Sequence, residues 1–225
     1  MVDNALSGPA LEALRGAVRE SPLVASSPLA GSFRGSRGFA VIFTAPGREK
    51  LSRRFPALAP FLALALEERP RATLWRLLAR PLPAANAFYL NVLILSAGAR
   101  IGRHVDGTLR GPSGAETVLP RRVSVLYLSV PGGPGGELRL WRGSGLVATV
   151  LPVPGRLVHF RGALDHEVAP LDSGGGERIS VVCEQYHLPP AGLARMEPFV
   201  LQSKAGFAAH LEDAGRAGPG DLTLD

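Results

Sequence analysis

The pattern of hydrophobic and polar positions divides the chain into a helical first part and a strand-rich second part. Near the start, Leu11, Leu14 and Val18 recur at the spacing of one helix face. The apolar residues of 57–68 and 71–80 recur in the same way, and prolines flank both segments at positions that suit helix ends. These three segments predict helices that pack their apolar faces against a sheet.

From about residue 87 onward, the chain consists of short runs rich in β-branched and aromatic residues, separated by Gly and Pro. Such runs are typical of strands joined by turns, and their regular spacing indicates a sandwich or a barrel. An earlier run at 39–44 is also strand-like, whereas the amphipathic pattern of 199–211 predicts a helix. The later strand-like runs are FYLNVLIL, RIGRHVD, RVSVLYLSV, GELRLW, LVATVLPV, RLVHF, HEVAPL and RISVVCEQYHL.

Together these patterns predict one α+β domain, mainly β, that spans residues 1–225. We expect a helical N-terminal brace over 1–85, a β core over 86–188 and a C-terminal extension over 189–225. A chain of this length can bury a core of its own, and a barrel or sandwich often uses such a length as one domain.

The formal net charge of +6 suggests a nucleic-acid partner, but the distribution of the basic residues argues against one. Only Lys50 and Lys204 are lysines, and the arginines are scattered along the chain instead of forming one stripe. Aromatic residues make up only 6% of the chain, too few to favour a platform that stacks bases. We therefore interpret the charge as a dispersed surface and expect no nucleic-acid partner.

The single cysteine, Cys183, excludes an intramolecular disulfide and any zinc or iron-sulfur site built from several cysteines. It favours a reducing, cytoplasmic setting, in which this residue is a small buried hydrophobe. The most apolar stretch, residues 58–66, contains a proline and is far shorter than the roughly 20 residues that cross a bilayer. The N-terminus does not resemble a secretory signal. We therefore expect no membrane span.

Three residues have the spacing of a metal site. His104 and Asp106 are two residues apart in an extended run, so both side chains leave the same face, and His166 begins a later strand-like run. Two imidazoles and one carboxylate form the ligand set of non-haem Fe(II) oxygenases, which leaves coordination positions open. The neighbouring acids Asp165 and Glu167 point to the opposite face of that later strand, so they are weaker ligand candidates.

A metal with open positions suits a second substrate that chelates it, and a dicarboxylate of this kind needs a cation at its far end. Arg178 follows His166 across a Gly-rich turn, in the next strand of an antiparallel pair. Ser180 shares its face by the period of two. A planar guanidinium holds a carboxylate through two hydrogen bonds, so Arg178 is the candidate anchor and Ser180 adds a hydroxyl.

In their order along the chain, these motifs resemble the 2-oxoglutarate- and Fe(II)-dependent dioxygenase superfamily, and within it the prolyl-4-hydroxylase-like branch. The resemblance covers about residues 91–187 and rests on LSAGARIGRHVD, RRVSVLYLS, GGELRLW, PVPGRLVHFRG, DHEVAPL and ERIS. It implies a double-stranded β-helix, a jelly-roll or cupin-like barrel, with helices that brace one sheet. It also implies Fe(II) on the ligand set His104, Asp106 and His166, and 2-oxoglutarate on Arg178 and Ser180.

The same resemblance implies a hydroxylase. Such an enzyme uses O2 to convert 2-oxoglutarate to succinate and CO2 and hydroxylates a C–H bond of a peptide side chain or a small metabolite. The metal centre does the chemistry, so we expect no separate acid or base; the resemblance also allows for ascorbate as an additional cofactor. Neither the substrate nor the oligomeric state follows from any motif in the chain.

The chain departs from the family pattern at one pocket position. Many relatives have a tyrosine nine residues before the first ligand histidine, where this chain has Leu95. Tyr127 is either part of the barrel lining or the source of a replacement hydroxyl, and Asn91 and Tyr89 are the other candidates for the pocket wall.

Two alternatives to the hydroxylase hypothesis stay open. One is a jelly-roll binding protein that holds a metal or a small acid without oxidation; the presence of all three ligands and the arginine disfavours it. The other is an enzyme that removes alkyl groups from nucleic-acid bases. That branch typically carries a second arginine six residues after the anchor, where this chain has Glu184, so it is also disfavoured.

Overall fold

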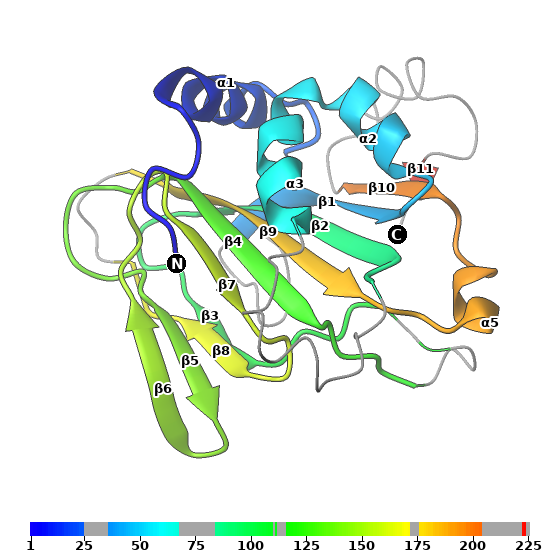
Figure 1. Cartoon of the computed structure of the whole chain (residues 1–225). Coiled ribbons are helices and arrows are strands. Elements are labelled where there is room, and N and C mark those ends of the chain that lie inside the picture. The colour runs from blue at the N-terminus through cyan, green and yellow to red at the C-terminus, as the bar shows by residue number, and fades with distance from the viewer. Residues whose placement is uncertain are drawn as a thin grey trace, which may run out of the picture.

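The structure is a computed structural model in which two β-sheets face each other and helices cover the outer face of the larger sheet (Figure 1). This arrangement confirms the expected α+β class with mainly β content. The described residues are 1–24, 36–67, 84–109, 111, 116–171, 176–203 and 222–223.

The larger sheet has the strand order β11-β10-β1-β2-β9-β4-β7 in the described part of the chain. Its neighbouring strands are antiparallel except for β10 and β11, which are parallel. The strands of this sheet are β1 (Ser36–Thr44), β2 (Ala87–Leu95), β4 (Arg122–Ser129), β7 (Leu157–Phe160), β9 (Arg178–Tyr186), β10 (Phe199–Ser203) and β11 (Leu222–Thr223).

The smaller sheet has the order β3-β8-β5-β6 and is antiparallel throughout. Its strands come from the second half of the chain, as the short strand-like runs predict. They are β3 (Ile101–His104), β5 (Leu138–Arg142), β6 (Gly145–Val150) and β8 (Asp165–Val168).

The first helix, α1 (Gly8–Arg19), confirms the prediction made from its apolar spacing. The Ser7 hydroxyl accepts a hydrogen bond from the backbone N–H of Ala10 at 3.4 Å, and a proline lies in the first turn. Leu14 and Val18 are buried on the face toward the sheet. The other helices are α2 (Arg48–Arg54), the short 3-10 helix η2 (Pro56–Leu58), α3 (Ala59–Leu66) and α5 (Pro190–Leu193).

Side chains of β4 and β9 form hydrogen bonds with the C-terminal end of α3. The Arg122 guanidinium donates to the carbonyl oxygens of Ala65 at 2.7 Å and Glu67 at 3.0 Å, and the Gln185 amide donates to Ala65 at 2.8 Å. These bonds satisfy carbonyls that a helix end leaves without intrahelical partners. The helix expected over 57–68 is confirmed, divided into η2 and α3; the one expected over 71–80 lies outside the described residues.

Strand β2 shows why its sequence is almost continuously apolar. Leu90 and Val92 pack on the helix side with the main core cluster, while Leu93 points toward the smaller sheet. Both faces of the strand are therefore covered, and the usual alternation of apolar and polar residues disappears. Asn91 is a polar exception on the inner face, and it lies in the wall of the pocket described below.

The larger sheet reaches beyond the segment 86–188 at both ends of the chain. Strand β1, which the run at 39–44 predicts, pairs with β2 along its whole length, and β10 pairs with the other edge of β1. The helix expected over 199–211 is wrong for its first five residues, which form β10. Phe199 and Leu201 are buried there at the period of two, which the sequence also allows; residues 204–211 lie outside the described part.

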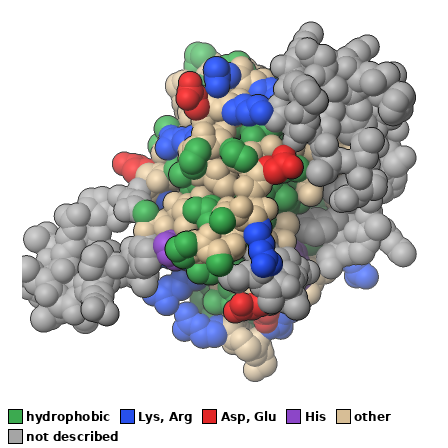
Figure 2. All heavy atoms as spheres, turned by 90° about the vertical axis from the view of Figure 1, so that its right-hand side faces the viewer, with side chains coloured by type: hydrophobic (Ala, Val, Ile, Leu, Met, Phe, Trp, Pro, Cys, Tyr) green, Lys and Arg blue, Asp and Glu red, His purple; other side chains and the backbone are tan. Residues whose placement is uncertain are grey.

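Figure 2 shows Lys and Arg side chains spread over one face of the molecule, some of them beside one another near its upper and lower ends, with acidic and apolar side chains among them. Within the described residues, the helices are too short or too polar to span a bilayer.

Candidate metal centre and anion pocket

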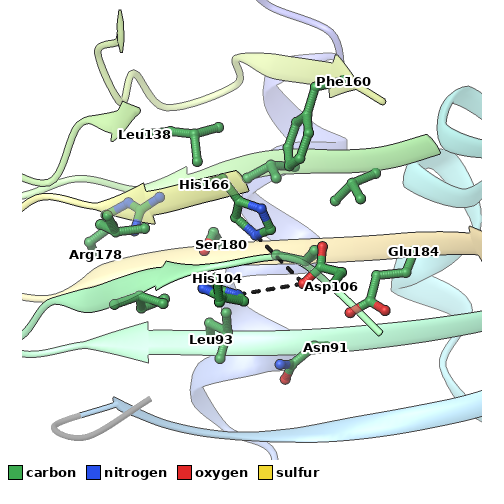
Figure 3. Close-up of a pocket in the computed structure, with 15 residues that line it drawn as sticks. Asn91, Leu93, His104, Asp106, Leu138, Phe160, His166, Arg178, Ser180 and Glu184 are labelled. Atoms are coloured by element: carbon green, nitrogen blue, oxygen red, sulfur yellow. Dashed lines mark ion pairs between the residues drawn. The ribbon is translucent and has the colours of Figure 1, made fainter. Parts of the chain in front are cut away.

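Three candidate ligands from two separate parts of the chain meet between the sheets. His104 ends β3, Asp106 follows two residues later, and His166 lies in β8, directly opposite His104 in the antiparallel pairing. Asp106 Oδ1 lies 3.5 Å from Nε2 of each histidine (Figure 3). One ligand atom from each residue lies within 4.8 Å of the others, so the three can surround one cation.

The backbone sets which imidazole nitrogen faces the centre of this group. His104 Nδ1 lies 2.7 Å from the carbonyl oxygen of Gly102, and His166 Nδ1 lies 3.3 Å from that of Leu164. A carbonyl only accepts, so each Nδ1 carries the proton and each lone pair is on Nε2, the atom that faces Asp106. A backbone partner on the outer nitrogen is the usual arrangement for a histidine that binds metal.

Burial and the Asp106 carboxylate have opposite effects on the pKa of each histidine: burial lowers it and the carboxylate raises it. For His104, burial opposes the charged form, but the hydrogen bonds to Asp106 and Gly102 outweigh it and raise the pKa. For His166, burial dominates over the attraction of Asp106 and lowers the pKa. Oδ2 of Asp106 is buried and has no hydrogen-bond partner within the described residues. A divalent cation would satisfy this oxygen, so the donor set fits a first-row transition metal.

The strands that carry the histidines are joined on their outer face by an ion pair. Arg103 lies 2.6 Å from Asp165, and its guanidinium lies 4.7 Å from the centre of the Trp141 ring. Glu167 pairs with Arg139 at 3.5 Å. Asp165 and Glu167 thus face away from His166, as the strand period predicts. Exposed pairs of this kind contribute at most about 1 kcal/mol each to stability, but they hold in place the residues adjacent to His104 and His166.

Strand β9 supplies one wall of the pocket that contains the three candidate ligands. Arg178, Ser180, Val182 and Glu184 line this pocket, whereas Cys183 points to the opposite face and is buried beneath the helices. The predicted alternation along β9 is therefore present, but the expected antiparallel pairing of this strand with the His166 strand is wrong, because β9 pairs with β2 and β4 in the larger sheet while β8 pairs with β3 and β5 in the smaller one. The other lining residues are Asn91, Leu93, Ile101, Val123, Val125, Leu138, Phe160 and Val168.

Arg178 is a buried cation with unused donors. Its side chain is 2% exposed, and neither Nε nor Nη1 has a hydrogen-bond partner among the described residues. Burying a charged group without a partner is costly, so the guanidinium fits an anion that enters the pocket. A carboxylate matches its planar donors in particular.

Tyr127 lies beside this guanidinium. Its ring centre is 4.9 Å from the Arg178 guanidinium carbon, and its backbone pairs with Ser180 across β4 and β9. The ring belongs to the core cluster between the sheets, and Tyr127 is not among the residues that line the pocket. Its buried hydroxyl has no hydrogen-bond partner in the described part of the chain, and burial raises its pKa against the opposing effect of Arg178. Tyr127 is therefore part of the barrel core and not of the pocket wall, and its ring lies beside Arg178.

The remaining candidates for this wall divide between the pocket and its surroundings. Asn91 lines the pocket, whereas Tyr89 is not among its lining residues. Leu95, at the position of the missing tyrosine, is fully buried in an apolar cluster.

Gly136 lies next to the aliphatic part of the Arg178 side chain, and substitution of this glycine should destabilise the fold. Its φ is +73°, and an added Cβ would lie 3.1 Å from Leu171 Cδ1 and 3.4 Å from Arg178 Cδ. We expect Gly136→Ala to lower the free energy of unfolding by about 1–2 kcal/mol, because a side chain is disfavoured in the left-handed region. Denaturant titration measures the change. Gly132→Ala is the matched control, since a Cβ there meets nothing within 4 Å and φ is not positive; equal losses in both variants would contradict the prediction.

Glu184 is a pocket residue that the sequence analysis used only to separate enzyme branches. Its carboxylate accepts hydrogen bonds from the Thr108 hydroxyl at 3.3 Å and from the Tyr186 hydroxyl. Burial, with the nearby charge of Asp106, raises the pKa of Glu184 to about 8. The period of two from Arg178 was the signal that would have placed it in the pocket.

The raised pKa of Glu184 should make the metal-free protein less stable as pH rises. Between its ordinary value of 4.5 and about 8, the folded state holds a proton that the unfolded chain has released. The free energy of unfolding should therefore fall with pH in this window, by roughly 1 kcal/mol per pH unit from this group. Urea titrations between pH 5 and 8 should show a steeper fall for the wild type than for Glu184→Gln. Identical slopes would contradict the prediction.

Comparison with known proteins gives likeness in structure alone. No protein-family model matches the chain, and no curated protein matches its sequence. A Pseudomonas putida prolyl-4-hydroxylase is similar in structure with a TM-score of 0.50 and 21% identity, over 83% of this chain and 90% of the other.

Two further solved structures are similar over most of their length. A Trichoplax adhaerens prolyl hydroxylase, in complex with a peptide of the hypoxia inducible factor oxygen degradation domain, has a TM-score of 0.53 and 16% identity, over 87% and 86% of the two chains. A Burkholderia pseudomallei oxidoreductase of the 2OG-Fe(II) oxygenase family has a TM-score of 0.50 and 15% identity, over 82% of each chain. The chain therefore has the fold of these oxygenase structures, and the expected double-stranded β-helix is confirmed.

Proposed function

We propose that this protein is an Fe(II)- and 2-oxoglutarate-dependent dioxygenase that hydroxylates a peptide side chain or a small metabolite. One observation carries the proposal: a single pocket contains both a His-Asp-His group able to surround one cation and a buried guanidinium with unused donors. A metal and a carboxylate at these two points are the requirements of a 2-oxo diacid that chelates iron at one end.

The residues have distinct roles in this proposal. His104, Asp106 and His166 would hold Fe(II), and Arg178 with Ser180 would bind the far carboxylate of 2-oxoglutarate. Bound iron supplies the activation of O2, which the side chains of the chain cannot provide. In the overall reaction, one oxygen atom of O2 enters the substrate C–H bond and the other enters succinate, while 2-oxoglutarate loses CO2.

The protein contributes orientation and a dry environment. Arg178 is held by its burial and by Tyr127, so the anchor is fixed before the diacid binds. Leu93, Val125 and Phe160 are apolar parts of the pocket wall. An apolar wall strengthens electrostatic contacts inside the pocket and limits side reactions with water.

A peptide substrate has support from one structural neighbour. The Trichoplax adhaerens hydroxylase was solved with a peptide fragment bound, and its structure covers most of this chain. A small metabolite with an accessible C–H bond uses the same metal and anchor, so both substrate classes belong to the proposal. We also propose a cytoplasmic location, which the lone buried Cys183 supports.

The binding-protein alternative makes a different prediction from the same site. A non-catalytic jelly roll would hold a metal or a small acid but would not consume O2. The completeness of the ligand set together with the anchor favours the hydroxylase. The base-dealkylation alternative is opposed by Glu184, which places a carboxylate where that branch has an arginine.

Oxygen-dependent formation of succinate tests the proposal. Purified protein is loaded with Fe(II) and 2-oxoglutarate without oxygen, O2 is admitted, and succinate is measured over time. We expect succinate that depends on both Fe(II) and O2, even at the slow rate typical of turnover without the second substrate. Arg53→Ala, which removes an arginine side chain that is 74% exposed, is the control for surface effects. Absence of succinate from folded, iron-loaded protein would contradict the proposal.

A further inference from the structure

The pocket continues along β9 beyond the candidate metal ligands. Arg178 and Glu184 lie on the same face of one strand, six residues apart, which separates their Cα atoms by about 20 Å. Figure 3 shows them at opposite ends of the pocket, with His104, Asp106 and His166 between them. The pocket therefore has two arms, one on each side of the metal ligands: the first arm contains Arg178 and the second contains Glu184.

The two arms carry ionisable groups of opposite type, a guanidinium in one and a carboxyl group in the other. Arg178 is the one Lys or Arg among the described residues that line the pocket, and Glu184 belongs to the other arm together with Asn91. Glu184 is only 4% exposed, and the hydrogen bonds recorded to its carboxylate come from hydroxyl groups, Thr108 and Tyr186. Each carboxylate oxygen accepts one of these bonds and keeps a further acceptor position.

This inference rests on the proposed function, in which 2-oxoglutarate binds in the first arm, between Arg178 and the metal. The molecule that is hydroxylated then binds in the second arm, where Glu184 and Asn91 are the polar groups. Burial without a cationic partner favours the neutral form of this carboxyl group, whereas a cation that pairs with it stabilises the carboxylate, so the chemistry of this arm selects positive charge.

We infer that Glu184 determines substrate specificity by binding a cationic nitrogen, an ammonium or a guanidinium, on the molecule that is hydroxylated. The substrate thus presents its cation to Glu184 and its reacting carbon to the metal. A lysine or arginine side chain of a peptide and a free basic amino acid share this chemistry. The carboxylate contributes binding and orientation, and it takes no part in the oxidation.

A structural role for Glu184 predicts a different outcome. Its bonds to Thr108 and Tyr186 connect β9 to the segment that follows Asp106, and Tyr186 also accepts a hydrogen bond from the Thr108 backbone N–H at 3.2 Å. If this connection were the only role of Glu184, its loss would disturb metal binding at Asp106 and would leave no preference for charge. Glu184→Gln separates the two roles because glutamine keeps the size and hydrogen-bonding capacity of the side chain and loses its charge.

Equilibrium binding tests the inference without relying on turnover. Protein loaded with Mn(II) and 2-oxoglutarate is titrated with matched pairs that differ in charge: lysine against norleucine, and arginine against citrulline. Each pair is used as the free amino acid and within a blocked tripeptide, which distinguishes the two sources of the cation. We expect the cationic member to bind roughly tenfold or more tightly in at least one of these forms, the difference that a hydrogen bond to a charged group typically makes.

The variant and the turnover assay complete the test. Glu184→Gln should remove most of the charge preference while its affinities for Mn(II) and 2-oxoglutarate stay close to those of the wild type. In the succinate assay, the preferred cationic compound should accelerate turnover of the wild type and become hydroxylated. Equal binding of charged and neutral members by the wild type would overturn the inference, as would a preference that survives in Glu184→Gln. Loss of succinate formation with the charge preference intact would instead contradict the proposed function alone.

Discussion

Replacement of His104 by alanine is expected to abolish metal binding and turnover. The change removes one of two imidazoles that face Asp106 and leaves a carboxylate and a single histidine, which is too few ligands for a stable iron site. We expect the affinity for Fe(II) or Mn(II) to fall by more than about 100-fold, a larger loss than removal of an outer partner of a ligand causes. Isothermal titration of metal into the apoprotein measures the effect.

His187→Ala is the matched control for this prediction. His187 is exposed, and its Nδ1 lies 2.8 Å from the carbonyl oxygen of Ala84, away from the pocket. Metal affinity in this variant should equal that of the wild type. If His104→Ala still bound one equivalent of metal with unchanged affinity, the assignment of the ligand group would be wrong.

Loss of Arg178 is expected to act on 2-oxoglutarate and to spare the metal. Arg178→Met keeps much of the buried stem and removes the guanidinium, so the diacid loses its paired cation. We expect the KM for 2-oxoglutarate to rise by roughly 30-fold or more, since truncation of a buried charge pair typically costs at least 2 kcal/mol. The KM is measured from succinate formation, and the metal affinity is measured by titration.

Ser180→Ala gives a graded comparison in the same arm. It removes a neutral hydroxyl, so the expected rise in KM is smaller than for Arg178→Met. Equal loss of metal affinity and of 2-oxoglutarate affinity in Arg178→Met would show that the arginine supports the fold around the metal ligands instead of binding the co-substrate.

The topology explains how one pocket contains both a candidate metal site and a candidate carboxylate-binding site. The smaller sheet carries the histidines on β3 and β8, while the larger sheet carries Arg178 and Glu184 on β9. Because the two sheets face each other, the ligand group lies against the middle of β9 and leaves an arm on either side. The helices then cover the outer face of the larger sheet and isolate the core beneath this wall from solvent.

Much of this site followed from the sequence because strand periodicity is simple. Spacing of two residues placed His104 with Asp106 and Arg178 with Ser180, and it placed Asp165 and Cys183 on the opposite faces. These residues lie in or next to regular strands, where the face on which a side chain lies depends only on whether its position is odd or even.

Other features depend on tertiary contacts that no local pattern contains. The short segment 199–203 fits a strand as well as a helix turn, and pairing with β1 decides in favour of the strand. The unused hydroxyl of Tyr127 and the hydroxyl partners of Glu184 arise between distant elements. Periodicity identifies the face on which such groups lie, but their partners come from the fold.

The structure of the protein in complex with Mn(II) and 2-oxoglutarate, determined without oxygen, tests the central claim most directly. The account predicts one metal ion bound by His104, Asp106 and His166, and 2-oxoglutarate that contacts this metal at one end and pairs with Arg178 at the other. A metal bound elsewhere, or 2-oxoglutarate that leaves Arg178 without a carboxylate partner, would contradict it.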